Sequence, residues 1–366
     1  MGIPNWLSVH QFEMVSGVLE PLEILLVVKS QDQIQRRQRM LDQLRRQHGK
    51  IGRLQPRPVA TGLLVKCQLP PPGGKQLRSE DAALVVQFAE PRHVVPYAKD
   101  RYLLTEVGRV ALIDAQGCVL DTFTHPYFAF LHTVFLNQAQ DRLLVTSAGY
   151  DAILELDVHT KAETWRWFGW DHGFNPNEEG VYYTNTREKA AALTAKGYTA
   201  KYIDPGEYNE YGLLTATRTT HPNVAFYNPY NAEATIIASL GYGKIVEIDR
   251  ITADYAIRLD LKAPVLHGLM PYNQGWMVTD TCRGEFWMLD RDFHVLQQYS
   301  FSKLPGKVEA AGEWEWLQVV VPVAPGKFLG LDANRGMIVC DTVRRCYEVF
   351  YPDPNWCLQD VLISAA

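Results

Sequence analysis

The sequence predicts an all-β protein built as a six-bladed β-propeller. Two observations lead to this fold class. A strand–turn–strand unit recurs five times, and a histidine or a glutamine recurs near the start of the strand that precedes it. A repeat of about 40 to 45 residues with four strands is typical of a propeller blade. The 366 residues, which by length alone suggest two or three domains, then form a single ring.

The recurring unit is a hairpin whose second strand ends on an aspartate. The five copies end at Asp114, Asp157, Asp249, Asp290 and Asp341. Their separations are 43, 92, 41 and 51 residues. Four of the turns carry glycine, as expected where a tight turn needs a positive φ. The second separation holds an excess of 49 residues, which predicts a long insertion at 170–218 with one short helix.

The chain before the repeats has a different charge. Residues 1–80 contain twelve Lys or Arg and six Asp or Glu, a balance of +6, which leaves −11 of the total of −5 for the rest. Apolar runs predict strands at 23–30, 59–69 and 82–88. Between the first two, a helix is expected at 31–48, with Ile34, Leu41 and Leu44 on one side. Its arginines are Arg36, Arg37, Arg39, Arg45 and Arg46.

We therefore divide the chain into an N-terminal segment, 1–90, and propeller repeats at 91–366. The C-terminal LQDVLIS resembles the first strand of a blade without its hairpin. Residues 20–90 are expected to supply the other strands of this sixth blade, because closing a ring removes exposed sheet edges. A seventh blade built wholly from the N-terminal strands is the alternative.

The strongest functional signal is a column of polar residues at the start of each first strand. In register, its members are His93, His132, His221, His267, Gln318 and Gln359. The innermost strands of a propeller line its central channel, so equivalent side chains on successive blades converge on one axis. The histidines are therefore expected to lie close together.

Three interpretations of this column stay open. In the first, a divalent transition metal, Fe(II) in preference to Zn, Mn or Cu, is held by His93, His132, His221 and His267 and supports oxygenase or lyase chemistry on a small organic substrate. In the second, an imidazole acts without metal as nucleophile or general base, while its neighbours stabilise an anionic group. In the third, the histidines and glutamines only satisfy one another in a water-filled channel.

The repeats, with a channel histidine opening a strand and turns such as DTCRGEFWMLD and SAGYDAILELD, resemble arylsulfotransferase-type and NHL-like six-bladed propellers over about residues 90–363. In arylsulfotransferases, channel histidines and an arginine handle the sulfuryl group and one histidine is the nucleophile. By position, the resemblance implies these roles for His132, His221, His267 and Arg283. The ring of four histidines is also similar to the iron site of carotenoid cleavage oxygenases.

A second group of residues shares the hairpin turns. Its members are Tyr150, Tyr242, Arg283 and Arg335. They are expected on one face, where arginine can bind a carboxylate, sulfate or phosphate; a solvated rim is the alternative. The predicted catalytic set is His267, His221, Arg283 and Tyr150. The insertion at 170–218 is expected to form a lid over one mouth of the channel and could bring His172 and Arg187 to it.

Composition excludes several classes of protein. The net charge of −5 argues against a dedicated nucleic-acid binder. No apolar run reaches the roughly 18 residues of a membrane span, and the N-terminus lacks the pattern of a secretory signal, so we expect a cytoplasmic protein. The six scattered cysteines predict reduced thiols. A non-catalytic propeller that docks an acidic protein partner through the basic helix 31–48 is a further alternative.

Overall fold

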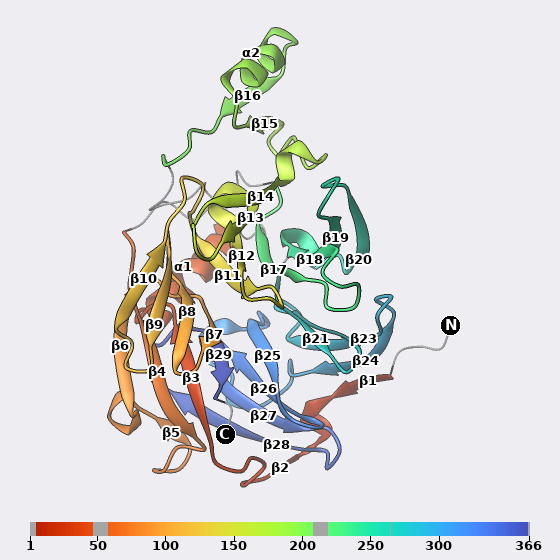
Figure 1. The fold of residues 1–366 in the computed structure, drawn as a ribbon. Helices are drawn as coiled ribbons and strands as arrows, with labels where there is room; N and C mark the ends of the chain where they lie inside the picture. Colours follow the sequence, from red (N-terminus) through yellow and green to blue (C-terminus); the bar gives the residue numbers. More distant parts are fainter. Residues whose placement is uncertain (1–4, 47–57, 208–218, 264, 365–366) are drawn as a thin grey trace.

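The computed structural model describes residues 5–46, 58–207, 219–263 and 265–364. Six small sheets stand around a central axis in these residues (Figure 1), which confirms the predicted six-bladed β-propeller. Five blades are consecutive in sequence, and in each of them the first strand is innermost. Residues 208–218 of the insertion and residues 47–48 of the expected helix lie outside the described chain.

The five consecutive blades are numbered in chain order. Blade 1 contains β7 (His93–Ala98), β8 (Arg101–Thr105), β9 (Val110–Asp114) and β10 (Val119–Phe123). Blade 2 contains β11 (Leu131–Leu136), β12 (Arg142–Ser147), β13 (Ala152–Asp157) and β14 (Glu163–Phe168). Blade 3 contains β17 (Pro222–Tyr227), β18 (Thr235–Leu240), β19 (Lys244–Asp249) and β20 (Tyr255–Asp260). Blade 4 contains β21 (Leu266–Tyr272), β22 (Gly275–Asp280), β23 (Glu285–Leu289) and β24 (Val295–Ser300). Blade 5 contains β25 (Leu317–Ala324), β26 (Lys327–Asp332), β27 (Gly336–Asp341) and β28 (Cys346–Pro352).

Blade 6 joins the two ends of the described chain. Its strands, from the channel outward, are β29 (Leu358–Ile363), β3 (Leu22–Val28), β4 (Thr61–Leu69) and β6 (Leu84–Ala89). The N-terminal strands thus complete the blade that the last strand begins, and the described residues contain no seventh blade. Three short strands pair with the outer edges of blades 4 and 5 and leave less of those edges exposed: β1 (Asn5–Ser8), β2 (Glu13–Met14) and β5 (Gln76–Leu77).

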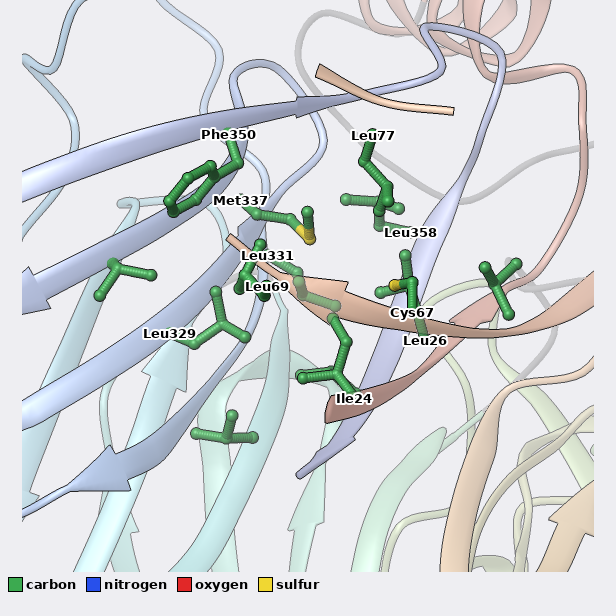
Figure 2. Close-up of a cluster of buried hydrophobic side chains, with 14 of the residues drawn as sticks. Ile24, Leu26, Cys67, Leu69, Leu77, Leu329, Leu331, Met337, Phe350 and Leu358 are labelled. Carbon is green, nitrogen blue, oxygen red and sulfur yellow. The ribbon is translucent and has the colours of Figure 1, made fainter. Parts of the chain in front are cut away.

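The apolar core lies between neighbouring blades. Figure 2 shows the cluster between blades 6 and 5, where Ile24 and Leu26 of β3 meet Leu329 and Leu331 of β26. Leu358 of the last strand belongs to the same cluster. Because both faces of an inner strand pack against other blades, such strands are continuous apolar runs instead of alternating ones.

The aspartates that end the hairpins stabilise the turns that follow. The Asp157 carboxylate accepts the backbone N–H groups of His159 and Thr160 at 3.0 and 2.8 Å. Asp249 accepts two backbone N–H groups in the same way. These hydrogen bonds favour the charged carboxylate and lower the pKa of both aspartates. The recurring aspartate therefore has a structural role.

Helix α1 (Gln33–Arg46) connects β3 to β4. The predicted apolar side was wrong in part, because Ile34 is 50% exposed whereas Gln33 and Leu41 are buried. The Gln33 and Arg37 side chains donate to the same carbonyl oxygen, that of Ala333 in the β26–β27 turn, at 3.2 and 2.5 Å. The helix thus packs its polar side on a turn of blade 5, not on an apolar core.

The insertion folds into a small unit of its own. It contains α2 (Arg187–Ala195) between the parallel strands β15 (Val181–Thr184) and β16 (Thr199–Tyr202), and Figure 1 shows it projecting from the ring beyond blade 2. The short helices in the described residues are η1 (Val9–Gln11), η2 (Ser79–Asp81), η3 (Ala148–Tyr150), η4 (Gly169–Asp171), η6 (Gly241–Gly243) and η7 (Glu309–Ala311). In the part of the chain that the structure describes, no helix has the length and apolar character needed to cross a membrane.

Candidate functional site

The column of polar residues stands on a series of β-bulges. In blades 2 to 6 the pairing register of the innermost strand shifts directly after its first residue. The residue at the shift has no partner in the ladder, and a bulge of this kind re-aims the side chain. The residues at this position are His132, Asn223, His267, Gln318 and Gln359, and His93 occupies the equivalent place in blade 1.

The register corrects one member of the predicted column. Pro222 pairs with Leu240 and Val224 with Ser239, so Asn223, not His221, is the bulge residue of blade 3. His221 precedes the strand and has a positive φ of 46°. The sequence places His221 in the column because the other blades carry histidine there, and this choice is two residues away from the true bulge residue, Asn223. The Asn223 amide nitrogen donates to the Leu266 carbonyl of blade 4 at 2.7 Å, so it also joins two blades.

His221 nevertheless reaches the site. The Asp151 carboxylate, in the β12–β13 turn of blade 2, accepts the backbone N–H groups of Thr219, Thr220 and His221. These bonds anchor the end of the insertion to blade 2. As a result the His221 ring meets the His132 ring edge to face, with 5.2 Å between centroids. Asp151 was not recognised from the sequence, although it is the last residue of the SAGYD turn.

His132 is the centre of the cluster. It is 7% exposed, and its ring lies parallel to that of His267 at 6.2 Å between centroids. The Arg92 guanidinium donates to Nε2 of His132 at 2.9 Å. Since guanidinium has no acceptor, Nε2 carries the lone pair and the ring proton is on Nδ1. Arg92 is itself 3% exposed and pairs with Glu90 at 3.3 Å.

The other two channel histidines are held by their Nδ1 atoms. His267 Nδ1 and the Thr281 hydroxyl are 2.9 Å apart. The Val134 backbone N–H donates to Nδ1 of His93 at 3.3 Å, and Nε2 of His93 lies 3.8 Å from the Asp360 carboxylate. Of these two rings, His267 keeps Nε2 for a ligand in the channel, whereas Nε2 of His93 faces the Asp360 carboxylate.

The electrostatic environment at this end of the channel is positive. Burial is the main cause of a pKa of about 3 for His267, and the charges of Lys29, Arg36 and Arg92 act in the same direction. The pKa of His132 lies well below its usual value, mainly through burial and then through Arg92. Both imidazoles are therefore neutral at physiological pH, in a field that favours an anion.

His93 differs from the other two. Burial lowers its pKa as well, but the neighbouring Asp360 carboxylate opposes that shift. The Asp360 side chain also accepts the Val94 backbone N–H at 3.2 Å. Asp360 of blade 6 is therefore an acceptor beside His93, whereas Arg92 is a donor beside His132.

A cavity of about 330 Å³ runs from this cluster into the ring. Arg92, His132 and His267 line it at the histidine end, the end at which all innermost strands begin. Farther along the same strands the lining is apolar, formed by Phe135, Met270, Val319, Val321, Leu362 and Ile363. The volume lies within the range of small-molecule pockets. Its lining suits a molecule with a charged head and an apolar body.

The donor set does not fit the predicted metal. Nε2 of His132 already accepts from a guanidinium, and the nearby charges that act on His132 and His267 are cationic. Among the described residues, one group offers three His, Cys, Asp or Glu ligand atoms within 4.8 Å of one another. It consists of Asp290, Asp292 and His294, outside the channel in an exposed turn. We therefore derive no step through a metal, and metal binding stays a prediction.

Three of the predicted turn residues have structural partners. Arg335 is buried and pairs with Glu315 and Asp332. Arg283 binds the Asp280 carboxylate at 3.0 Å and the Leu261 carbonyl oxygen at 3.3 Å. Tyr150 is fully buried, and its hydroxyl approaches the Asp204 carbonyl oxygen of the insertion at 3.5 Å. Tyr242 is 41% exposed. None of these four residues lines the channel cavity.

The described part of the insertion packs on blade 2. His172 stacks on Trp167 of β14 with 5.3 Å between ring centroids, and the Arg187 guanidinium lies 3.4 Å from the Asp204 carboxylate within the insertion. No residue of 170–207 lines the cavity. A lid at 170–218 therefore stays a prediction.

The sequence patterns did not predict a functional role for Arg92 or Lys29. Arg92 stands directly before the column residue of blade 1, where the other blades carry Leu or Pro. Lys29 directly follows β3, a strand far from the repeats in sequence. A charged residue at an otherwise apolar repeat position was the available signal for Arg92.

Comparison with known proteins supports the fold alone. No family model matches this chain, and no curated protein matches it. Among solved structures, it is similar to a protein of unknown function from Bacteroides caccae. The TM-score is 0.51 at 10% sequence identity, over 94% of this chain and 99% of that chain. At this identity the likeness carries no information on activity.

Proposed function

We propose that this propeller binds a small organic anion in its central channel without a metal. The observation that carries the proposal is the Arg92 guanidinium, held against Nε2 of His132 at the mouth of a cavity whose far end is apolar. The charged head of the ligand would meet Arg92 and the neutral imidazole of His267. Its apolar body would pack against Phe135 and Met270.

Removal of the anion-binding charge provides the test. Arg92→Met should weaken the binding of benzoate, phenyl phosphate or phenyl sulfate by roughly 10- to 100-fold, the usual worth of a hydrogen bond to a charged group. Isothermal titration calorimetry measures this change. Benzyl alcohol, which has the same ring and no charge, should not bind. Arg166→Met is the matched control, since Arg166 is half exposed on the outer strand of blade 2.

Divalent metals should be titrated in the same experiment. If Fe(II), Zn(II) or Mn(II) binds wild-type protein stoichiometrically and the anions do not bind, the proposal is wrong and the metal-dependent oxygenase or lyase gains support. Binding of an anion that is unaffected by Arg92→Met would place the site elsewhere.

The geometry also favours a second candidate, group transfer through a histidine nucleophile. His267 is neutral at physiological pH. When its Nδ1–H donates to the Thr281 hydroxyl at 2.9 Å, the lone pair of Nε2 is available to attack a sulfuryl or phosphoryl group. Arg92 would stabilise the oxygens of that group. A covalent adduct on His267 after incubation with 4-nitrophenyl sulfate or 4-nitrophenyl phosphate, found by mass spectrometry, would support this role. Turnover that persists in His267→Gln would contradict it.

A further inference from the structure

The channel cavity is divided into a polar part and an apolar part along the innermost strands. Among the described residues that line it, every polar side chain lies at or before the third residue of its strand, as Thr133 of β11 and Asp360 of β29 do. Beyond this position the lining is apolar. It reaches Met270, the fifth residue of β21, and Ile363, the last residue of β29. The apolar part therefore follows the innermost strands for much of their length.

The wall of the apolar part is mainly aliphatic. Of the described lining residues, Phe135 is the one aromatic residue besides histidine, and its ring contacts the His93 ring with 4.8 Å between centroids. A contact with Phe226 at 5.7 Å holds the Phe135 ring from another side. The other apolar side chains of the lining belong to valine, leucine, isoleucine and methionine. Since an aromatic ligand gains most beside other aromatic rings, this wall favours an aliphatic body.

The dimensions of the cavity determine the length of an aliphatic ligand. From Gln359 to Ile363 the lining covers four residue steps of β29, about 13 Å at roughly 3.3 Å per residue. An extended chain advances about 1.2 Å per bond, one third of the rise of an extended residue, so about ten bonds fit this length. The cavity volume of about 330 Å³ agrees, because it holds about eleven groups of the size of water, at roughly 30 Å³ each, and a methylene group is of similar size.

We propose that the ligand of the channel is an unbranched aliphatic acid of about eight to ten carbons. The inference rests on the proposed function, which places the anionic head at Arg92, and it adds the chemical class of the body. The chain extends from the histidine end past Met270 toward Ile363. The described lining offers no polar side chain to water in the apolar part, so each methylene group that displaces this water adds hydrophobic free energy.

A series of carboxylic acids tests this inference on the full-length protein. Isothermal titration calorimetry with butyrate, hexanoate, octanoate, decanoate and dodecanoate should show a Kd that falls about fourfold for each added methylene, the usual worth of a buried methylene. This gain should end at about eight to ten carbons. Met270→Trp narrows the apolar part and should end the gain about two to four carbons earlier, with the Kd of butyrate unchanged. Leu296→Trp is the matched control, since Leu296 is 58% exposed on the outer strand β24 of the same blade, and it should leave the whole series unchanged.

The same titrations separate this inference from the proposed function. If benzoate and butyrate bind and depend on Arg92, but the Kd does not fall with chain length, the aliphatic ligand is overturned and the anion site stands. If the gain per methylene is found and Arg92→Met changes none of the Kd values, the chain site is supported and the anion site is wrong. A gain in wild-type protein that continues through dodecanoate contradicts a channel of this length, and this result does not depend on whether Met270→Trp folds.

Discussion

Replacing His267 by glutamine should remove much of the acid sensitivity of the protein. Glutamine is the natural residue at the same bulge position in blades 5 and 6, as Gln318 and Gln359, so the substitution keeps a side chain that this position accepts. His267 has a pKa of about 3 in the folded state against 6.5 for an unperturbed histidine. A lowered histidine pKa contributes stability above pH 6.5, and that stability is lost as the pH falls from 6.5 toward 3.

The size of the loss in stability follows from the lowered pKa of His267 in the folded state. Each pH unit below 6.5 costs 1.36 kcal/mol, so lowering the pH from 7 to 5 costs up to about 2 kcal/mol. His267 is only part-buried, and solvent screening reduces the expected loss to about 1 to 2 kcal/mol. His132 is present in both proteins, but His267 is one of the groups that lower its pKa, so the difference between the two proteins includes that smaller contribution.

Urea unfolding at pH 7, 6 and 5 at constant ionic strength measures this difference. Wild-type protein should lose about 1 to 2 kcal/mol more than His267→Gln over this interval. His159→Gln, at an exposed turn position, should behave as wild type. Phenyl phosphate should raise the stability of the wild-type protein at pH 5, because a ligand that binds only the folded state stabilises that state. Parallel loss of stability in wild type and His267→Gln would refute the reasoning.

Three further predictions concern the scaffold. Gly275→Ala places a Cβ 2.0 Å from a carbonyl oxygen and should lower the free energy of unfolding by about 1 to 3 kcal/mol. Gly73→Ala is the control and should leave the free energy of unfolding unchanged, because its Cβ would have nothing within 4 Å. The midpoints of urea unfolding compare the two variants. Tyr227→Phe removes the hydroxyl that donates to buried Glu155 at 2.9 Å and should cost about 1 to 3 kcal/mol in urea titrations at pH 7. Truncation before Leu358 removes the innermost strand of blade 6 and should abolish the cooperative calorimetric transition.

The number of blades was predictable because it depends on a period, which one sequence displays repeatedly. The period was less informative for individual side chains. Asn223 was missed because the insertion before blade 3 removes the spacing that would have aligned it, and His221 lay two residues away. A bulge position can be aligned only when the pairing register is known, and cross-strand pairing is not visible in a single chain.

The charged residues around the column were not predictable for a different reason. Lys29 is separated by more than two hundred residues from His267 in sequence, yet its charge acts on that imidazole. Only ring closure brings them together. The apolar side of α1 was likewise predicted only in part. Buried Gln33 and part-buried Arg37 donate to a carbonyl oxygen of blade 5 and so break the apolar pattern of an ordinary surface helix.

The interlocking of the two chain ends in blade 6 also affects how the protein is made. β29 lies between the channel and β3. During synthesis, β3 and Lys29 therefore lack their inner neighbour until β29 leaves the ribosome. Blades 1 to 5 consist of consecutive strands and can form as they emerge. The proposed ligand site is thus completed last, and a nascent chain that stalls before β29 can bury much of its core before that site exists.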